Sequence, residues 1–147
     1  MALEPQIIRC ANCSAQNRVP AEKLVEGLKP TCGRCKQPLT AVQPIVVTDS
    51  TFAEIIRSPL PVLVDVWAPW CGPCRHLSPI VDELAGELAG RVLVAKLNAD
   101  ENPQISSRFN IQNIPALLVM QGGREVDRLV GVRPKAEILR HLTPVMA

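Results

Sequence analysis

Strand-like and helix-like patterns of apolar residues alternate through the second part of the chain. Residues 61–67 and 91–98 are nearly continuous apolar runs, which is typical of central strands buried on both faces. Residues 116–120 and 125–130 are two further predicted strands, and the Gly122-Gly123 pair between them indicates a hairpin. The last two strands are therefore expected to be antiparallel.

Predicted helices separate these strands. Apolar residues recur at spacings of three and four between Leu77 and Leu88, which predicts a helix over 71–89 that is kinked at Pro79. The order of elements predicts an α/β domain with a parallel part and a terminal antiparallel hairpin. Shorter helical patterns cover 52–57, 102–109 and 134–142.

The composition changes near residue 42. Residues 1–42 contain six basic and three acidic residues, four of the six cysteines and no long periodic segment. The stretch 37–44 includes Pro38 and Pro44, which favours a short, stiff linker. We therefore expect two domains, at residues 1–42 and 43–147.

Charge and hydropathy limit the classes of partner. A net charge of +2 on 147 residues is too small to argue for binding to nucleic acid or to an anionic membrane. No apolar run approaches the roughly 18 residues of a membrane span. The first residues lack the charged head and apolar stretch of a signal peptide. These features favour a cytoplasmic protein without nucleic-acid or membrane partners.

The six cysteines form three Cys-x-x-Cys pairs. One pair, Cys71 and Cys74, encloses Gly72-Pro73 where a buried strand meets a helix. A thiol at a helix N-terminus faces free backbone N–H groups, which stabilise the thiolate. Cys71 is therefore the predicted nucleophile. Cys74, one turn into the helix and more sheltered, is placed to attack a mixed disulfide on Cys71. The alternative is a third pair of zinc ligands, for which no partner pair remains.

Asp65 interrupts an apolar run that should be buried. A buried carboxylate is costly unless it is partnered or protonated, and such a cost often marks a functional site. We hypothesise that Asp65 lies beneath the dithiol with a raised pKa and takes the proton of Cys74. Lys96 interrupts the next strand and is a candidate partner of Asp65. The alternatives are an Asp65 that faces water at a strand edge and a solvated Lys96 at a strand end.

The Ile114-Pro115 bond comes directly before the predicted strand 116–120. Proline is allowed at the start of a strand, and an X-Pro bond can be cis in a tight bend. Spacing alone favours the ordinary trans bond.

The remaining four cysteines have the spacing of a four-thiolate zinc site, with 18 residues between the two pairs. About 40 residues bury too little apolar surface to fold unaided, so that metal would supply folding energy. Four free thiols or two disulfides are the alternatives. Zinc with four thiolates carries a charge of −2, which lowers the net charge of residues 1–42 from +3 to about +1. So small a positive charge argues against a zinc ribbon that binds nucleic acid. The predicted ligands are Cys10, Cys13, Cys32 and Cys35.

Several motifs of the second segment are shared with one known family. They lie at 64–74, Pro79, 95–100, 114–117, Gly123 and 130–131. On these motifs, residues 45–147 resemble a thioredoxin over their whole length. The resemblance implies a thioredoxin fold, with a central mixed sheet flanked by helices, and protein-disulfide reductase activity. It implies Cys71 as nucleophile, Cys74 as resolving thiol, Asp65 as buried acid and Lys96 as its neighbour.

The resemblance also implies a substrate and a partner. Disulfide-containing proteins would be the substrates, and an NADPH-dependent flavoprotein, thioredoxin reductase, would recycle the dithiol. Gly-Pro between the cysteines is the reducing variant of the family, for which a potential of about −270 mV is expected.

Val66 and Met120 stand where the family often has Phe, which alters packing rather than chemistry. A cis Pro115 is implied to face the disulfide, in a groove for an extended substrate backbone bordered by Trp70, Gly72, Pro73, Ile114, Val130 and Gly131.

The N-terminal segment resembles that of zinc-binding bacterial thioredoxins of the thioredoxin 2 type. Residues 10–13, 17–20, 32–36 and 68–70 carry this match. It implies a zinc ribbon-like module that holds one structural Zn²⁺ per chain with no open coordination position. A redox-sensitive module that ejects zinc on oxidation is a second hypothesis. A chaperone-like binder is a third, and its activity would survive loss of both Cys71 and Cys74.

Overall fold

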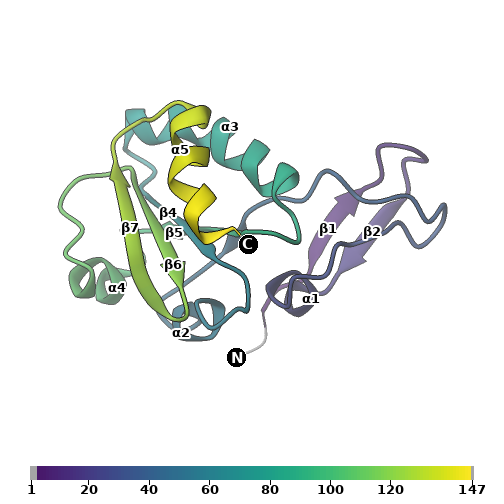
Figure 1. Ribbon diagram of the computed structural model, residues 1–147, viewed down its shortest axis with the longest axis horizontal. Helices are drawn as coiled ribbons and strands as arrows, with labels where there is room; N and C mark the ends of the chain where they lie inside the picture. The colour runs from purple at the N-terminus through teal and green to yellow at the C-terminus, as the bar shows by residue number, and fades with distance from the viewer. Residues whose placement is uncertain (1–2, 147) are drawn as a thin grey trace.

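The computed structural model describes residues 3–146, in which a five-stranded sheet carries helices on both faces (Figure 1). The strand order is β3-β5-β4-β6-β7; β3 and β4 run parallel to β5, and β6 is antiparallel to β4 and β7. This is the predicted parallel part with a terminal antiparallel hairpin. The strands are β3 (Ile45–Val46), β4 (Val62–Trp67), β5 (Leu93–Asn98), β6 (Ala116–Gln121) and β7 (Arg124–Val130).

Two helices pack on each face of the sheet. Alternation along β4 divides the core, since Leu63 packs on the face of α3 and α5 while Val62 and Val64 pack on the other. Every predicted strand and helix between residues 52 and 142 is present, with ends within two residues of the expected ones. None of the helices formed by residues 3–146 has the length and hydropathy of a membrane span. The helices are α2 (Phe52–Ile55), α3 (Gly72–Glu87), α4 (Pro103–Arg108) and α5 (Lys135–Leu142), followed by the 3₁₀ turn η1 (Thr143–Val145).

Val66 and Met120, the two residues that depart from the family pattern, lie in the core on the α2 and α4 face. Both side chains are fully buried. Asp65, one residue along β4, points to the opposite face. Both residues therefore lie on the side of the sheet away from Asp65, and that they alter packing rather than chemistry stays a prediction.

The N-terminal segment forms a small unit of its own secondary structure. The strands β1 (Gln6–Arg9) and β2 (Gln16–Val19) are antiparallel, and the short helix α1 (Ala21–Val25) follows them. Figure 1 shows β1 and β2 projecting away from the five-stranded sheet. The sequence did not predict these elements, because each is only four or five residues long and too short for a periodic pattern.

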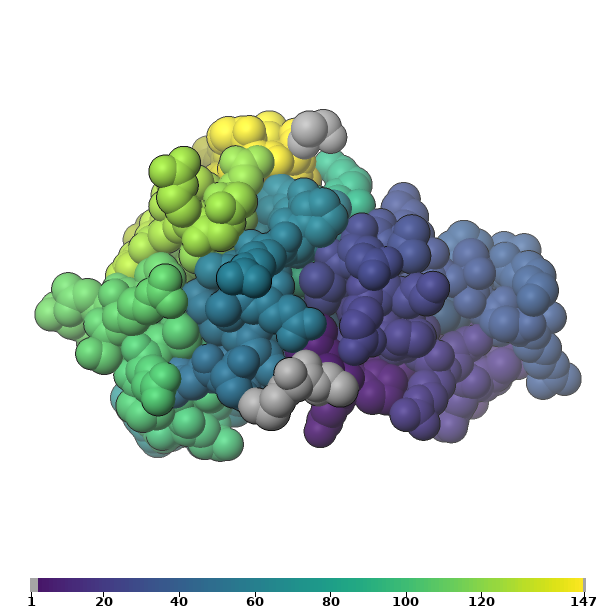
Figure 2. Space-filling model, turned by 90° about the horizontal axis from the view of Figure 1, so that it is seen from below, coloured from purple at the N-terminus to yellow at the C-terminus, as the bar shows by residue number. Residues whose placement is uncertain are grey.

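The N-terminal segment shares one hydrophobic core with the five-stranded sheet. Leu24, Leu39 and Val42 belong to the same buried cluster as the residues of β3, β4 and β5. The Ser58 hydroxyl donates a hydrogen bond to the Val25 carbonyl, and in Figure 2 the two parts of the chain lie directly against each other. The stretch 37–44, predicted as a linker, is therefore packed. The domain division at residue 42 stays a prediction.

Candidate active site and metal site

The dithiol lies where β4 turns into α3. Cys71 caps the N-terminus of α3, and Cys74 is one turn into the helix. The two residues form a disulfide, with their Cα atoms 5.3 Å apart. The Cys71 sulfur accepts a hydrogen bond from the Cys74 backbone N–H at 3.2 Å. In the reduced protein this donor, together with the helix dipole, favours the thiolate form of Cys71.

The two cysteines differ in surroundings rather than in exposure. Cys71 is 3% exposed and Cys74 is 4% exposed, so exposure does not support the expectation that Cys74 is the more sheltered residue. What separates them is contact: a backbone N–H points at the Cys71 sulfur, whereas Cys74 lines a cavity that also holds Asp65. The environment of Cys71 favours a thiolate, and that of Cys74 offers a nearby carboxyl group.

A cis peptide bond faces the disulfide. The Ile114-Pro115 bond is cis, as the family resemblance implied and contrary to what spacing alone favoured. The Cys71 sulfur is 3.8 Å from the Ile114 carbonyl oxygen. The Gly131 N–H donates to the Pro115 carbonyl at 2.8 Å, which ties the end of β7 to this bend. These contacts bring three of the predicted groove residues, Ile114, Pro115 and Gly131, together beside Cys71.

Exposed apolar side chains surround this bend. Trp70 is 69% exposed and Val130 is 40% exposed, although both are large apolar residues. The Trp70 indole N–H donates to an Asp100 carboxylate oxygen at 3.1 Å, which fixes the ring beside the dithiol. Gly72 has open space where a Cβ would lie. The result is an exposed apolar rim beside the dithiol, a surface suited to a polypeptide partner.

Asp65 is buried in the central strand β4, so the strand-edge alternative is wrong. It is 2% exposed, and its Oδ1 atom has no hydrogen-bond partner among residues 3–146. Burial raises the pKa of Asp65 from 3.8 to about 7; the Lys96 ammonium acts against this rise, and the Asp82 carboxylate adds to it. The carboxyl group therefore exchanges its proton near neutral pH, as a proton acceptor must.

Lys96 is the register partner of Asp65 on β5, but its ammonium binds elsewhere. The Lys96 Nζ atom is 2.9 Å from the Asp82 Oδ1 atom and donates to the Ser78 hydroxyl at 2.7 Å. Its side chain is only 21% exposed, so it is not a solvated strand-end lysine. Sequence reasoning missed Ser78 and Asp82. The signal was their spacing, because Cys74, Ser78 and Asp82 follow at intervals of four on one side of α3.

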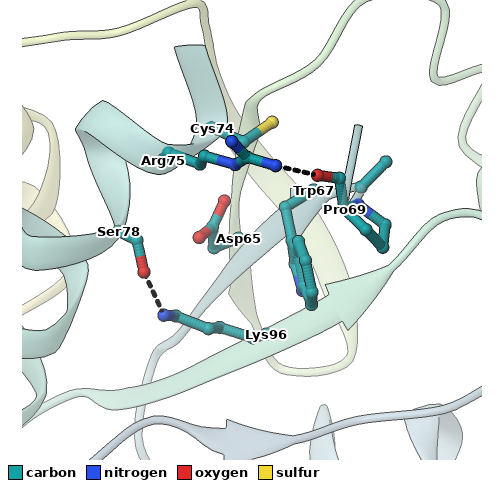
Figure 3. A pocket seen from close by; sticks show the side chains of 8 residues that line it. Asp65, Trp67, Pro69, Cys74, Arg75, Ser78 and Lys96 are labelled. Atoms are coloured by element: carbon teal, nitrogen blue, oxygen red, sulfur yellow. Dashed lines mark hydrogen bonds between the residues drawn. The ribbon is translucent and has the colours of Figure 1, made fainter. Parts of the chain in front are cut away.

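A cavity of about 130 Å³ lies between Asp65, Cys74 and Lys96. Figure 3 shows Asp65 below Cys74 and Arg75, with the bond between Ser78 and Lys96 beneath it. The Arg75 guanidinium donates to the Pro69 carbonyl at 3.0 Å at the upper wall. The volume and the polar side chains of Asp65, Ser78 and Lys96 allow water molecules to enter the cavity between apolar walls. The lining residues are Asp65, Trp67, Ala68, Pro69, Cys74, Arg75, Ser78 and Lys96.

The four N-terminal cysteines converge at the tip of the β1–β2 unit. All four sulfurs lie within 4.8 Å of one another, and the Cys10–Cys35 and Cys13–Cys32 sulfur pairs are both 3.6 Å apart. Each pair sits in a tight turn, and the residue after each second cysteine has a positive φ, 64° at Ser14 and 66° at Lys36. Two matching turns thus present four thiols to one point.

This arrangement fits a tetrahedral zinc ion. Four thiolates bound to zinc at about 2.3 Å lie about 3.8 Å from one another, close to the observed sulfur contacts. The Cys35 backbone N–H and the Asn17 side-chain amide lower the pKa of Cys32 to about 6. Against the Ala15 backbone, which lowers it, burial and the neighbouring thiols raise the pKa of Cys13 to about 11, so that without a metal the thiolate is favoured at Cys32 and disfavoured at Cys13. Asn17 also accepts from the Gly33 N–H and donates to the Ala15 carbonyl, so that it joins the two turns.

Comparison with known proteins agrees with this geometry. The family model described as Thioredoxin matches residues 43–144. The chain belongs to the thioredoxin family. It is accordingly a thiol–disulfide oxidoreductase with a thioredoxin fold, and its dithiol has the expected place at the start of α3. A second model, described as Thioredoxin 2, N-terminal, matches residues 9–37, the part of this thioredoxin that holds the four clustered cysteines.

Two relatives illustrate how far the similarity reaches. Thioredoxin C-3 of Corynebacterium nephridii is 41% identical over 137 residues, which cover 92% of this chain and 92% of the relative. Thioredoxin 1 of Nostoc sp. is 52% identical over 97 residues, which cover 65% of this chain and 91% of the relative. The first similarity therefore includes the N-terminal segment of this thioredoxin.

Proposed function

We propose that this thioredoxin reduces disulfides of protein substrates, with Cys71 as the nucleophile and Cys74 as the resolving thiol. One observation carries the proposal. The Cys71 sulfur lies at the N-terminus of α3, accepts the Cys74 N–H, and borders the cis Ile114-Pro115 bend and its apolar rim. A nucleophile, a donor that stabilises its thiolate and a surface for an extended chain meet at one sulfur atom.

The first step forms a mixed disulfide. The Cys71 thiolate attacks one sulfur of the substrate disulfide, so that a bond forms between Cys71 and that sulfur while the substrate S–S bond breaks. The second substrate sulfur leaves as a thiolate and takes a proton from solvent. The groove holds the substrate backbone beside Cys71. Its residues are Trp70, Gly72, Pro73, Ile114, Pro115, Val130 and Gly131.

The second step releases the substrate. Asp65 takes the proton of Cys74 across the cavity, and the Cys74 thiolate attacks the Cys71 sulfur. The Cys71–Cys74 disulfide forms, the mixed disulfide breaks, and the remaining substrate sulfur leaves as a thiolate, which takes a proton from solvent, while Asp65 returns its proton to solvent. Two electrons pass from the dithiol to the substrate. Lys96 acts on this step through its charge, because it lowers the pKa of Asp65.

The dithiol is then regenerated by an NADPH-dependent flavoprotein, thioredoxin reductase, in the cytoplasm. The family resemblance supports both the partner and the compartment. Gly72-Pro73 between the cysteines supports a reducing potential of about −270 mV. Together these features support a role in the maintenance of cellular dithiols.

In the N-terminal module, Cys10, Cys13, Cys32 and Cys35 hold one structural zinc ion, which supplies folding energy. A second proposal is that this site responds to oxidants. Cys13 and Cys35 are partly exposed, and each is 3.6 Å from a buried partner sulfur. Two equivalents of peroxide would take four electrons from the two pairs, form two disulfides and release the zinc. Peroxide that oxidises Cys71 without releasing zinc would rule this out.

Reduction of insulin by the protein with NADPH and thioredoxin reductase tests the main proposal. Cys71→Ser is expected to abolish turnover, and Asp65→Asn is expected to slow resolution of the mixed disulfide about tenfold or more at neutral pH. An unchanged rate and pH profile in Asp65→Asn would remove the base role. A chaperone-like binder would instead keep its binding of protein substrates in the double variant Cys71→Ser, Cys74→Ser, which cannot reduce a disulfide.

A further inference from the structure

In the cavity beside the dithiol, the ammonium group of Lys96 has bonding partners, whereas the carboxyl oxygen Oδ1 of Asp65 has none among residues 3–146. Asp65 has a buried carboxylate oxygen without a hydrogen-bond partner among residues 3–146, although an ammonium group lines the same cavity. That ammonium, on Lys96, is bonded to Ser78 and Asp82 instead. A lysine has three donors, and two of them are engaged on α3. The cation therefore acts on Asp65 only through space.

The geometry of α3 explains this preference. Ser78 and Asp82 are one helical turn apart, so that their side chains lie one above the other and contact the same Nζ atom at 2.7 and 2.9 Å. The Asp82 side chain is 52% exposed, so that its carboxylate is in contact with solvent, whereas Asp65 is buried. An ammonium gains more from a hydrated anion with a second oxygen beside it than from a buried carboxyl group.

We propose that Ser78 and Asp82 are positioning residues, which hold the Lys96 ammonium out of hydrogen-bonding contact with Asp65 and so keep Asp65 able to accept the proton of Cys74. This inference rests on the proposed function, in which Asp65 is the proton acceptor. A lysine free to bind Asp65 directly would stabilise the carboxylate and weaken it as a base.

The titratable and charged groups around Asp65, among residues 3–146, enter this balance. β5 contributes Lys96, and α3 contributes Cys74, Arg75 and Asp82. Arg75 is bound to the Pro69 carbonyl, and β6 places the apolar Leu117 opposite Asp65. The pKa of Asp65 is raised by burial, lowered by Lys96 and raised by Asp82. Lys96 is therefore the cation whose position Ser78 and Asp82 control.

The test is a titration of the Asp65 carboxyl group, followed by ¹³C NMR in the oxidised protein. In that state Cys71 and Cys74 are joined and do not titrate. Ser78→Ala removes a neutral anchor, so any change reflects the position of Lys96 rather than a lost charge. We expect Ser78→Ala to lower the titration midpoint of Asp65 by about half a pH unit, a threefold change in proton affinity. Asp82→Asn is expected to lower it further.

Three matched variants complete the experiment. Asp82→Glu is expected to restore the original midpoint. Glu83→Gln removes a neighbouring charge that contacts Lys135 instead, and is expected to leave the midpoint unchanged. In a Lys96→Met background, the effect of Ser78→Ala is expected to vanish.

An unchanged midpoint in Ser78→Ala and Asp82→Asn would overturn the proposal, and so would a Ser78→Ala effect that persists without Lys96. The titration does not depend on turnover. Failure of the base role would appear separately, as an unaffected rate of resolution in Asp65→Asn.

Discussion

Asp65 and Lys96 are neighbours in register on the parallel strands β4 and β5, but the Lys96 ammonium is bonded to Asp82 and Ser78 on α3. The carboxyl group of Asp65 is thus left with an unpartnered, buried oxygen beside the dithiol. A direct ion pair would have lowered the pKa of Asp65 and so favoured its ionised form. The observed arrangement gives instead a carboxyl group whose pKa lies near neutral pH, because burial opposes ionisation.

The burial of Asp65 has a consequence for stability. Its pKa is about 7 in the folded protein and 3.8 when exposed. The folded state therefore binds the proton more tightly than the unfolded chain, so the free energy of unfolding falls as pH rises from about 4 to about 7. At 1.36 kcal/mol per pH unit, the ionised Asp65 costs about 4 kcal/mol above pH 7. Asp65→Asn, which cannot ionise, is expected to be more stable than the wild type at pH 8 by up to this amount.

Urea unfolding between pH 4 and pH 9 measures this effect. The stability difference between Asp65→Asn and the wild type should be small at pH 4, widen up to pH 7 and then remain constant. Asp100→Asn, on an exposed turn, serves as the control, and its difference should not follow this profile. A stability gain of Asp65→Asn that is independent of pH would show that Asp65 is not a buried titrating group.

Removal of zinc is expected to destabilise the whole chain rather than the N-terminal module alone. Leu24, Leu39 and Val42 of the module are buried in a cluster that continues into the five-stranded sheet, so that a loss of structure in the module also exposes part of that cluster. A loss of several kcal/mol of binding energy should lower Tm by about 10 °C. Thermal unfolding with and without a strong chelator measures this, with the metal content determined on the same samples.

The matched variants for this experiment are Cys10→Ala and Cys71→Ser. Cys10→Ala removes one proposed ligand and should reproduce the effect of the chelator. Cys71→Ser leaves all four ligands in place and should retain both the zinc and its contribution to Tm. A protein that loses its zinc and keeps its Tm would contradict a structural role of the metal.

Gly86 provides a test of the contact between α3 and the stretch 37–44. A Cβ atom at this position would lie 2.6 Å from the Thr40 carbonyl oxygen. Helix propensity alone predicts that Gly86→Ala stabilises the protein by about 1 kcal/mol. The close backbone contact reverses the sign, and we expect a loss of about 1–3 kcal/mol. Denaturant unfolding of Gly86→Ala decides between the gain and the loss of stability. His76→Ala, on an exposed position of α3, is the control.

Sequence patterns were sufficient for the sheet and its helices, because long strands such as β4 and β5 and the helix α3 have clear periods of apolar residues. The short strands β1, β2 and β3 were missed, because two to four residues carry no measurable period. Leu39 and Val42 were expected in a linker. Their burial depends on contacts with distant residues, which a local pattern does not show.

For the site, residue chemistry and the family resemblance indicated Cys71, Cys74, Asp65, Lys96 and the cis Pro115. The partner of Lys96 was not predicted. The predicted pair of Lys96 and Asp65 rested on their positions in adjacent strands. In the structure the Lys96 ammonium extends away from the sheet and binds side chains of α3. A competition between two carboxylates for one lysine depends on their burial, which becomes known only in three dimensions.

The central claim is that Cys71 attacks and Cys74 resolves, and trapping of the mixed disulfide tests it most directly. The Cys74→Ser variant should be incubated with a disulfide-bonded protein such as insulin, quenched with acid and analysed by mass spectrometry of its peptides. We expect a stable mixed disulfide at Cys71 in Cys74→Ser and none in Cys71→Ser. A substrate adduct at one of the four N-terminal cysteines, or an adduct at Cys74 in the Cys71→Ser variant with undiminished turnover, would contradict the account.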